Sequence, residues 1–375
     1  MTMLKAFKYR IYPTKQQEIL LNKTFGCVRV VWNHNVEIFN KYDKNLTEQE
    51  QPLTSTELRK KFKWMQEISA AALQQKEMDF KTFKNNYFSK TRKKKIGRPS
   101  FKKKHNNQSF RLPNQKFSLK DNRIRLEKIG KIKIVIDREV PINSKFMSVT
   151  ISKNKSNQFF ASVLVEMEII PKEKTGKSIG IDIGITNFLT LSNNTIVDNP
   201  RYFRESQTKL AKAQKHLSRK LKDSKRRQKA NLKVARIHIN IANKRKDFIH
   251  KETTKLINEY DIIAIEDLNV AGMVKNHKLA KSISDASFAE FYNVLSYKAD
   301  WYGKEIIKID RWFASSKTCS CCGWKDNDLT LSDRVFKCEI CGLELDRDIN
   351  ASKNILNEAL RVSNAQRTQS EYQTV

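Results

Sequence analysis

The chain begins with a strand-like pattern and continues with helical ones. Residues 4–12 alternate apolar with basic side chains, as a strand with one buried face does, and Pro13 ends the run. Two capping boxes follow, Thr14 with Gln17 and Thr54 with Glu57, and each predicts the start of a helix. A further helix is predicted by apolar residues at helical spacing, namely Leu73, Phe80, Phe83 and Tyr87. We interpret these aromatic residues as core rather than as a surface that stacks bases. Residues 13–90 are therefore predicted to form a helical insertion.

The segment from residue 115 to 170 carries short β signals separated by turn residues. Alternating or continuous apolar runs occur at 132–136, 147–151 and 159–167, and Asp121-Asn122 and Lys153-Asn154 separate them from their neighbours. A small antiparallel barrel that includes the first strand and hosts the helical insertion would account for this pattern.

Beyond a polar linker at 171–177 the pattern changes. Strands are predicted at 179–191, 195–197, 261–266 and 306–310, with a tight turn at Asn193-Asn194, and helices at about 204–258 and at 287–305. One sheet could bring these strands together. The tail after Arg361 is polar, and we expect it to be disordered.

The net charge of the chain limits which binding partners are plausible. The 375 residues include 73 Lys and Arg against 40 Asp and Glu, so the formal charge is 73 − 40 = +33. Such a charge destabilises a compact monomer by self-repulsion, and a bound polyanion relieves it. Nucleic acid is favoured over a membrane surface because the basic residues are spread over every region. No run of about 18 apolar residues predicts a membrane span, and the N-terminus lacks the apolar core of a signal peptide.

Two segments concentrate this charge. Residues 91–104 hold eight basic residues, no acid and a Gly-Arg-Pro break, which predicts a loop that contacts phosphate rather than a solvated tail. Residues 209–251 hold sixteen Lys or Arg against two Asp, on a helical stretch with one apolar stripe. The candidate nucleic-acid contacts are Arg98, Lys102, Lys103, Lys225, Arg226 and Arg227.

Four of the six cysteines have metal-ligand spacing. Cys319, Cys322, Cys338 and Cys341 follow C-x2-C-x15-C-x2-C, with a glycine after each pair. This pattern predicts one tetrahedral zinc site, and its role is structural because four thiolates leave no position open for water. Cys27 and Cys321 remain, which argues against a secreted disulfide framework and favours a reducing cytosol.

Three acidic residues, far apart in sequence, are candidates for catalysis. Asp182 lies in Ser-Ile-Gly-Ile-Asp-Ile-Gly, Glu266 ends an apolar strand, and Asp348 opens a predicted helix. Converging carboxylates repel one another unless cations share their charge. We therefore expect the three acids to bind two Mg²⁺ ions. Asp182 would bridge both ions, and Glu266 and Asp348 would each bind one of them. Glu266 competes with Asp267 for a place in the cluster, and Asp348 competes with Asp346. The Asp182-x-Gly184-x-Thr186 pattern also occurs in actin-like sugar kinases, but that alternative explains neither the cysteines nor the basic helix.

These motifs together resemble the TnpB/OrfB family, transposon-encoded proteins related to type V CRISPR effector nucleases. The resemblance covers essentially the whole chain. It rests on Tyr9-Arg-Ile-Tyr-Pro-Thr, Phe25-Gly with Val31-Trp-Asn, Gly97-Arg-Pro-Ser-Phe-Lys, Gly180-Ile-Asp-Ile-Gly, Ile265-Glu-Asp-Leu-Asn, Ser315-Ser-Lys-Thr-Cys, Cys341-Gly and Asp346-Arg-Asp-Ile-Asn-Ala.

The resemblance implies an α+β multidomain fold. A small antiparallel wedge β-barrel (1–12 and 115–170) would carry a helical recognition insertion with its basic loop (13–114). A RuvC-like α/β domain of RNase H fold (171–375) would follow, with a four-cysteine zinc finger inserted at 313–345 and a disordered tail at 361–375. The family's catalytic acids correspond to Asp182, Glu266 and Asp348, and its zinc ligands to the four cysteines.

The implied function is that of an RNA-guided, Mg²⁺-dependent DNA endonuclease of an insertion sequence. It would bind a guide RNA from the transposon end, as one protein per guide, and cleave double-stranded DNA beside a short transposon-adjacent motif. The expected location is the bacterial or archaeal cytosol. Two alternatives stay open: a guided DNA-binding regulator without nuclease activity, and a transposase that performs strand transfer itself.

Overall fold

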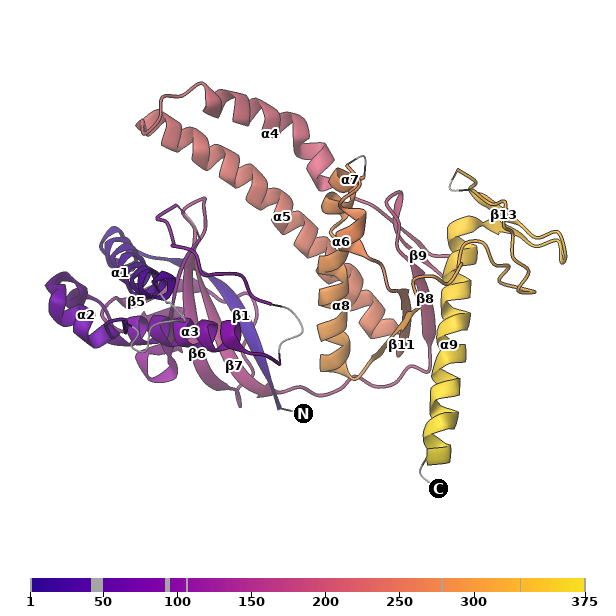
Figure 1. Cartoon of the computed structure of the whole chain (residues 1–375), viewed down its shortest axis with the longest axis horizontal. Helices are drawn as coiled ribbons and strands as arrows, with labels where there is room; N and C mark the ends of the chain where they lie inside the picture. Colours follow the sequence, from indigo (N-terminus) through magenta and orange to yellow (C-terminus); the bar gives the residue numbers. More distant parts are fainter. Residues whose placement is uncertain are drawn as a thin grey trace. The chain divides into compact units, whose positions relative to one another are not determined.

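The structure is a computed structural model that describes residues 2–41, 50–91, 95–105, 107–277, 279–330 and 332–373, with side chains up to residue 364. The chain divides into two compact units, Met1–Glu168 and Ile169–Val375 (Figure 1). Each unit has a sheet and helices of its own. Within the described residues, every helix is too short or too polar to span a membrane.

The first unit is built around a seven-stranded antiparallel sheet. Its strands, in spatial order, are β2 (Gln108–Pro113), β6 (Lys145–Lys153), β7 (Phe159–Glu168), β1 (Thr2–Tyr12), β5 (Gly130–Val135), β4 (Arg123–Leu126) and β3 (Phe117–Lys120). The central strand β1 pairs with β7 from Thr2↔Glu168 to Ile11↔Phe159. The far side of the sheet curls back, because the ring of Phe117 on β3 lies 6.1 Å from that of Phe146 on β6. The sheet is thus a nearly closed barrel.

The expectation that the barrel includes the first strand is correct, but its boundary is not. Strand β2 pairs with β6 from residue 108 onward, so the sheet begins earlier than residue 115. The sequence Gln-Ser-Phe-Arg-Leu-Pro alternates buried with exposed residues, and its proximity to the basic loop hid this short signal.

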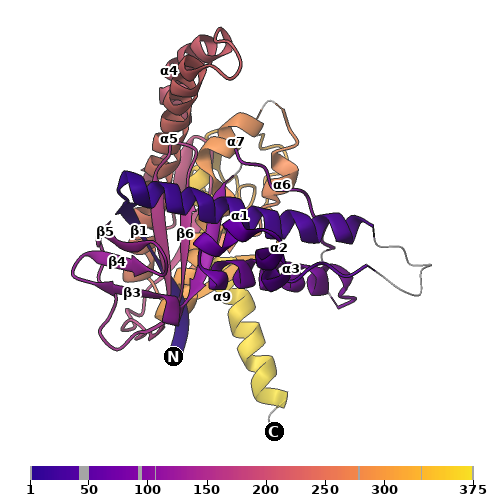
Figure 2. The ribbon, with the colours of Figure 1, turned by 90° about the vertical axis from the view of Figure 1, so that its left-hand side faces the viewer.

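Helices inserted between β1 and β2 pack on this sheet. They are α1 (Lys15–Asn40), α2 (Ser55–Lys61) and α3 (Ala70–Phe88), with a 3₁₀ turn at Lys63–Glu67; a second 3₁₀ turn, Asn114–Lys116, follows β2. Figure 2 shows α1 and α3 side by side. Both capping boxes are present: Thr14 and Thr54 each accept a hydrogen bond from the backbone N–H three residues later. Phe80 is buried, in contact with Trp32 and Phe39, so the prediction that this aromatic residue is core is confirmed.

The second unit contains a five-stranded mixed sheet. Its order is β10 (Ile196–Asp198), β9 (Asn187–Leu191), β8 (Ser178–Asp182), β11 (Ile262–Glu266) and β12 (Glu305–Ile309). The first three strands are antiparallel, and β8, β11 and β12 are parallel. The single strand predicted at 179–191 is wrong, because the chain reverses at 183–186. A side chain at Gly184 would meet the Asn187 carbonyl at 2.8 Å, so this reversal is too tight for any larger residue.

Helices cover both faces of this sheet. Ile263 and Ile265 of β11 pack with α5 (Lys225–Glu259), α7 (Ala280–Ala286) and α8 (Phe288–Tyr302) in one apolar cluster. Ala264, which points the other way, packs with α9 (Arg347–Gln373). A short helix, α6 (Val270–Met273), and a hairpin of β13 (Val335–Lys337) and β14 (Glu344–Asp346) complete the unit.

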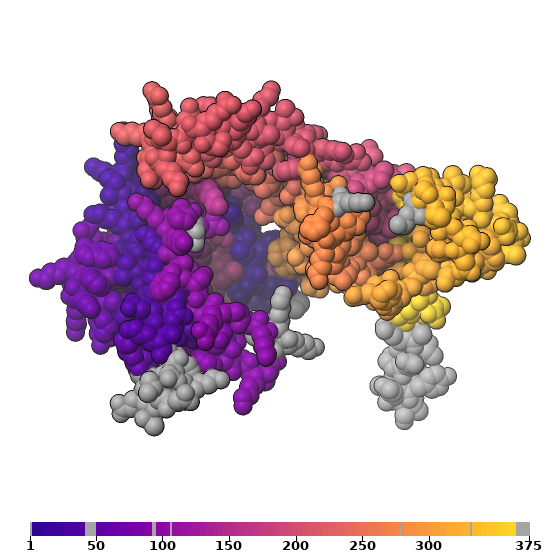
Figure 3. Space-filling model, turned by 45° about the horizontal axis from the view of Figure 1, so that its top comes forward, coloured from indigo at the N-terminus to yellow at the C-terminus, as the bar shows by residue number. Residues whose placement is uncertain are grey.

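The long helix predicted at 204–258 is two antiparallel helices. The first is α4 (Tyr202–Ser218), and α5 begins at Lys225 after a turn in which Asp223 has a left-handed backbone (φ 62°) and Ser224 caps the new helix. Asp and Ser are typical of such turns, but the Lys and Arg residues around them concealed the break. The helices share an apolar seam that includes Leu210 and Ile237. The surface of this hairpin is the red ridge in Figure 3.

The tail expected to be disordered from residue 361 is helical as far as Gln373. This part of α9 has neither glycine nor proline and holds three Gln and two Arg, which are good helix formers. Because elongating a formed helix is far easier than starting one, such residues extend the packed part of α9 without needing a core of their own.

The position of α9 depends on Gly180 in β8. A methyl group there would lie 2.1 Å from the Ser352 carbonyl oxygen and 2.8 Å from the Leu356 backbone nitrogen. Backbone atoms cannot rotate away, so only glycine allows this contact. Gly180 is two residues before Asp182, and Ser352 is four residues after Asp348. Close packing at this point therefore sets the distance between the two acids.

We predict that Gly180→Ala pushes α9 off the sheet. The free energy of unfolding should fall by about 1–3 kcal/mol, the usual cost of overpacking. Gly26→Ala is the matched control, because a side chain there meets nothing closer than 3.9 Å. Urea denaturation of both variants measures the effect. Wild-type stability in Gly180→Ala would contradict the tight packing.

Candidate active site and metal centre

Two parallel strands and one helix bring the three candidate acids together. Asp182 ends β8 and Glu266 ends β11, and neighbouring parallel strands place these ends at one edge of the sheet. Asp348 lies in the first turn of α9, which packs on β8. All three side chains line one pocket of about 230 Å³. Arg334, Arg347 and Ser315 line the same pocket.

The pocket disfavours negative charge. Burial, followed by the charges of Glu266 and Asp348, raises the pKa of Asp182 to about 8, and the nearby Arg347 opposes this rise only partly. Burial also raises the pKa of Glu266. Carboxylates held in this way repel one another in a low-dielectric setting, which a bound cation relieves.

Neighbouring side chains hold the acids in place. The Ser315 hydroxyl donates a hydrogen bond to the Glu266 carboxylate, and the Tyr292 hydroxyl donates to the Glu266 backbone carbonyl at 3.1 Å. Arg347 donates to the Asp348 carboxylate at 3.2 Å, and both of these side chains are largely buried. The acids are therefore oriented before any substrate or ion arrives.

The structure also separates each acid from its competitor. Asp267 forms an ion pair with Arg311 and does not line the pocket. Asp346 instead caps α9, because its carboxylate accepts hydrogen bonds from the backbone N–H groups of Asp348 and Ile349 at 2.9 and 3.1 Å. Glu266 and Asp348 are thus the members of the cluster.

The pocket suits hard cations. Its donors are carboxylate oxygens, which Mg²⁺ prefers, and three acids face two arginines. Among the described residues, only the four cysteines form a group of three or more ligand-bearing residues whose ligand atoms all lie within 4.8 Å of one another. The acids therefore do not enclose a single small site.

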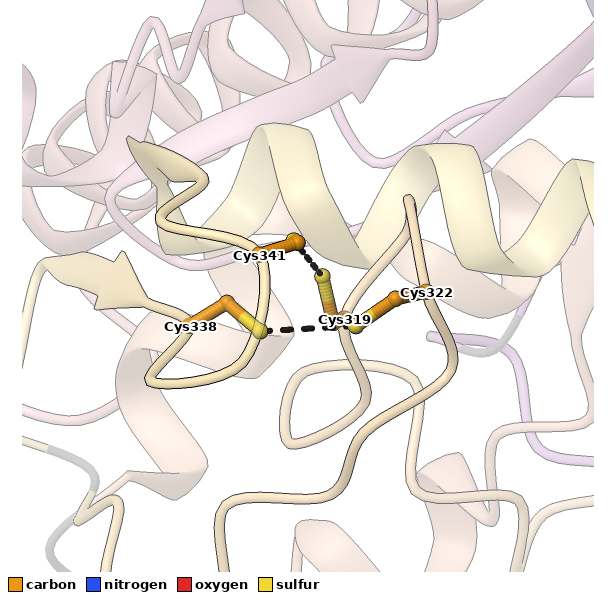
Figure 4. Close-up of side chains that lie close together, drawn as sticks. All are labelled: Cys319, Cys322, Cys338 and Cys341. Atoms are coloured by element: carbon orange, nitrogen blue, oxygen red, sulfur yellow. Dashed lines mark hydrogen bonds between the residues drawn. The ribbon is translucent and has the colours of Figure 1, made fainter.

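The four cysteines form a compact cluster (Figure 4). The Sγ atoms of Cys319 and Cys341 are 3.6 Å apart, and those of Cys322 and Cys338 are 3.5 Å apart. Four thiolates at about 2.3 Å from a tetrahedral zinc ion would be roughly 3.8 Å apart, so the geometry fits zinc. Each pair is followed by a glycine with positive φ, Gly323 at 79° and Gly342 at 70°. Cys321 is exposed and lies outside the cluster.

Two buried asparagines fasten this cysteine cluster to α9. Asn350 donates to the Thr318 carbonyl at 2.7 Å and accepts from the Ser320 N–H at 2.9 Å. Asn354 donates to the Ser315 carbonyl at 2.8 Å. Sequence reasoning assigned no role to these asparagines, to Ser315 or to Arg347. The signal was present for three of them, because Ser315, Arg347 and Asn350 lie inside the motifs quoted above.

The candidate nucleic-acid contacts have different surroundings. Arg98, Lys103, Lys225 and Arg226 are exposed. Arg227 instead donates to the carbonyls of Leu217 and Lys220 at 3.3 and 2.8 Å, so it closes the turn between α4 and α5. Lys102 lies over the Trp32 ring. Residues 92–94 of the basic loop lie outside the described residues.

Comparisons with known families and sequences agree with these features. The OrfB_IS605 family, described as "Probable transposase", matches residues 162–277, and "Cas12f1-like, TNB domain" matches residues 288–355. A "putative RNA-guided DNA endonuclease" of Streptomyces pristinaespiralis is 38% identical over 96% of this chain and 90% of its own length. InsQ of Escherichia coli K12, which has the same description, is 30% identical over 95% of this chain and 92% of its own length. The chain belongs to the TnpB/OrfB family.

A solved structure shows the same fold as this TnpB/OrfB chain. In a complex with guide RNA and target DNA, Cas12f1 aligns with a TM-score of 0.58 at 16% identity, covering 95% of this chain and 99% of Cas12f1. A family described as "Helix-turn-helix domain" matches residues 1–44. Within the described part of that range, residues 2–12 are a strand and residues 15–40 a single helix, so no helix-turn-helix forms there.

We predict that Cys338→Ser lowers both zinc content and stability. Loss of one thiolate should reduce bound zinc measured by mass spectrometry, and the melting temperature should fall because metal binding contributes folding free energy. Cys321→Ser is the matched control and should keep one zinc per chain. Full zinc occupancy in Cys338→Ser would contradict the assignment of the ligand.

We also predict that Asp182→Asn stabilises the Mg²⁺-free protein at alkaline pH. The pKa of Asp182 rises from 3.8 in the unfolded chain to about 8 in the folded protein, so the stability of the wild type falls as pH rises from about 4 to 8. Asparagine does not ionise and escapes this loss. Its melting temperature should exceed that of the wild type by several degrees at pH 8.5, with little difference at pH 4.

The melting measurements use buffers without Mg²⁺ and without a chelator, so that zinc is retained. Asp267→Asn is the control, because that carboxylate lies outside the pocket, and it should show no such pH-dependent gain. A constant difference between Asp182→Asn and the wild type across this pH range would contradict the burial of a charged Asp182.

Proposed function

We propose that this protein is an RNA-guided, Mg²⁺-dependent DNA endonuclease of an insertion sequence. The observation that carries the proposal is the convergence of Asp182, Glu266 and Asp348 in one pocket where burial and mutual repulsion disfavour their negative charge. Membership of a family whose full-length relatives have names of this kind supports it. The second unit then has a RuvC-like fold of the RNase H type, which its mixed five-stranded sheet with helices on both faces supports.

The proposed partners are a guide RNA from the transposon end and a double-stranded target. The charge of +33 favours polyanions, and the related Cas12f1 fold occurs in a complex with guide RNA and target DNA. The guide would pair with one DNA strand, while the wedge barrel and its recognition helices would detect a short motif beside the target. We propose one protein per guide RNA, in the cytosol of the host cell.

The residues of the pocket divide the work of cleavage. The strand β8, which ends in Asp182, contacts both the strand that carries Glu266 and the helix that carries Asp348, so Asp182 is the ligand that would be shared between two ions. Ser315 and Arg347 keep Glu266 and Asp348 from turning away. Two Mg²⁺ ions would activate the attacking water and stabilise the leaving oxygen. The zinc site is structural, and Asn354 on α9 holds the segment that carries Ser315.

We predict that Asp182→Ala abolishes cleavage and leaves binding intact. Loss of the shared ligand should lower the cleavage rate at least about 10³-fold, the scale of removing one preorganised electrostatic contact in an active site. Guide RNA and target binding should stay within about threefold of wild type, because Asp182 lies outside the two basic segments of the sequence, 91–104 and 209–251. Purified ribonucleoprotein with a plasmid carrying the target and its adjacent motif provides the assay.

Three other outcomes would refute parts of this proposal. A wild-type ribonucleoprotein that binds its target in Mg²⁺ without nicking it would be a guided regulator. Strand-transfer products from transposon-end DNA, formed without RNA, would identify a transposase. Loss of RNA binding in Asp182→Ala to the same degree as loss of cleavage would mean that this residue is architectural.

A further inference from the structure

The first unit contains a cluster of cations around a single carboxylate. Lys76 on α3 forms a short ion pair with Asp79, with 2.6 Å between Nζ and Oδ2, and Arg111 on β2 donates to the other oxygen of Asp79 at 2.9 Å. Lys102, on the loop before β2, lies close enough to interact with both Lys76 and Asp79. Three cations thus gather at one acid.

This cluster carries more positive charge than its own packing needs. Lys76 is 9% exposed and neutralises Asp79, which leaves Lys102 and Arg111 as surplus cations. Burial, followed by the charge of Lys76, lowers the pKa of Lys102 to about 8, so its environment opposes its charge. The Nε of Arg111 is buried and has no hydrogen-bond partner. An anion at the exposed side of the cluster would balance the surplus charge of Lys102 and Arg111.

The loop that carries Lys102 is held in a fixed position. Asn33 on α1 accepts from the Lys102 N–H at 2.8 Å and donates to its carbonyl at 3.1 Å. Trp32 donates from its indole nitrogen to the Ser100 carbonyl at 3.1 Å, and the Lys102 ammonium lies 3.9 Å from the centre of the Trp32 ring. The Lys102 side chain is therefore ordered before an anion binds, so binding costs little additional side-chain entropy.

A purely structural ion network is the competing interpretation. Such a network would tie α3 to β2 through Lys76, Asp79 and Arg111 alone, and it gives no reason to bring Lys102 to the same carboxylate. The other acid nearby in sequence, Glu77, is engaged elsewhere, because it accepts from the Ser55 N–H at 2.8 Å. The opening of the cluster is polar, since Arg111 and Asp79 are 40% and 31% exposed.

We propose that Lys102 and Arg111 together bind one phosphate of a nucleic-acid backbone, with Lys76 and Asp79 holding Arg111 in place. This inference rests on the proposed function in one respect, namely that nucleic acid is the partner. The phosphate can belong to the guide RNA or to the target duplex, and both present the same group. Lys76 and Arg111 would thereby join Lys102 as part of a site that the sequence pattern did not predict.

The test compares Lys102→Met, Arg111→Gln and the double variant with wild type. Methionine retains the side-chain stem over Trp32 and removes the charge. Lys133→Met, an exposed residue on β5, is the control for a loss of one charge elsewhere on the unit. Affinity is measured between about 50 and 200 mM salt, in one arm for guide RNA alone and in the other for the ribonucleoprotein with target duplex. Circular dichroism and melting curves check the fold.

In one of the two arms, each single variant should bind about tenfold more weakly, the scale of a charge-assisted contact. The slope of log affinity against log salt should become shallower by up to about 0.9 for duplex DNA or about 0.7 for a single strand. Because both residues bind one phosphate, the double variant should lose no more slope than that. The arm that responds identifies the strand.

Variants that bind like Lys133→Met in both arms would overturn the site. Weaker binding with an unchanged salt slope would overturn it too, since that pattern reports altered structure rather than a lost phosphate contact. A cleavage assay on the same preparations separates the two proposals. If the variants bind and cleave like the wild-type protein, the phosphate site is refuted and the nuclease proposal stands. If the wild-type protein binds its target without cleaving it, the nuclease proposal is refuted and the phosphate site stands.

Discussion

The close contact between α9 and β8 at Gly180 is the constraint on which the candidate active site depends. Asp182 and Glu266 come from adjacent strands, so the sheet itself brings them together. Asp348 comes from a helix more than eighty residues further along the chain, and only packing can deliver it. Because Ser352 and Leu356 touch the strand where a side chain is absent, the helix approaches closely enough for Asp348 to reach the strand ends.

The same arrangement makes the pocket electrostatically unfavourable when it holds no cation. Two acids and burial act on Asp182, and a single arginine offsets them in part. The surrounding fold holds these groups in place by hydrogen bonds and by one ion pair, which neutralises only part of their charge. Ser315 and Arg347 orient two carboxylates, while Asn350 and Asn354 fix the segment from which Ser315 comes. Stability is thus given up at the site and recovered in the packing around it.

The sequence predicted those features that local chemistry determines. The capping boxes, the zinc ligand spacing and the three acids each depend on residue type and short-range pattern, and the structure contains both caps, the cysteine cluster and a pocket that the acids share. The turn at Asp223, the reversal at Gly184 and the helical tail were missed. In each case the deciding signal was one or two residues inside a longer pattern of the opposite kind.

Residue roles that depend on distant neighbours were beyond sequence reasoning. Arg227 belongs to a basic run, yet it caps the end of the preceding helix. Lys102 belongs to another basic run, yet an aromatic ring and an asparagine on α1 determine its position. Lys76 and Arg111 are separated from Lys102 in sequence, and no sequence pattern joins the three. The sequence alone does not distinguish a lysine or arginine that closes a turn from one that faces solvent.

The polar underside of α9 has a consequence for how this helix can move. Asn350, Ser352 and Asn354 are buried, and the two asparagines satisfy specific carbonyl and amide groups. An aliphatic helix can slide by one turn, about 5.4 Å, and find equivalent contacts. Here the same slip would strand buried amides without partners, at a cost of about 1–3 kcal/mol each, and would carry Asp348 away from the strand ends. The helix α9 therefore has one stable register on the sheet, and this register determines the spacing of the acids.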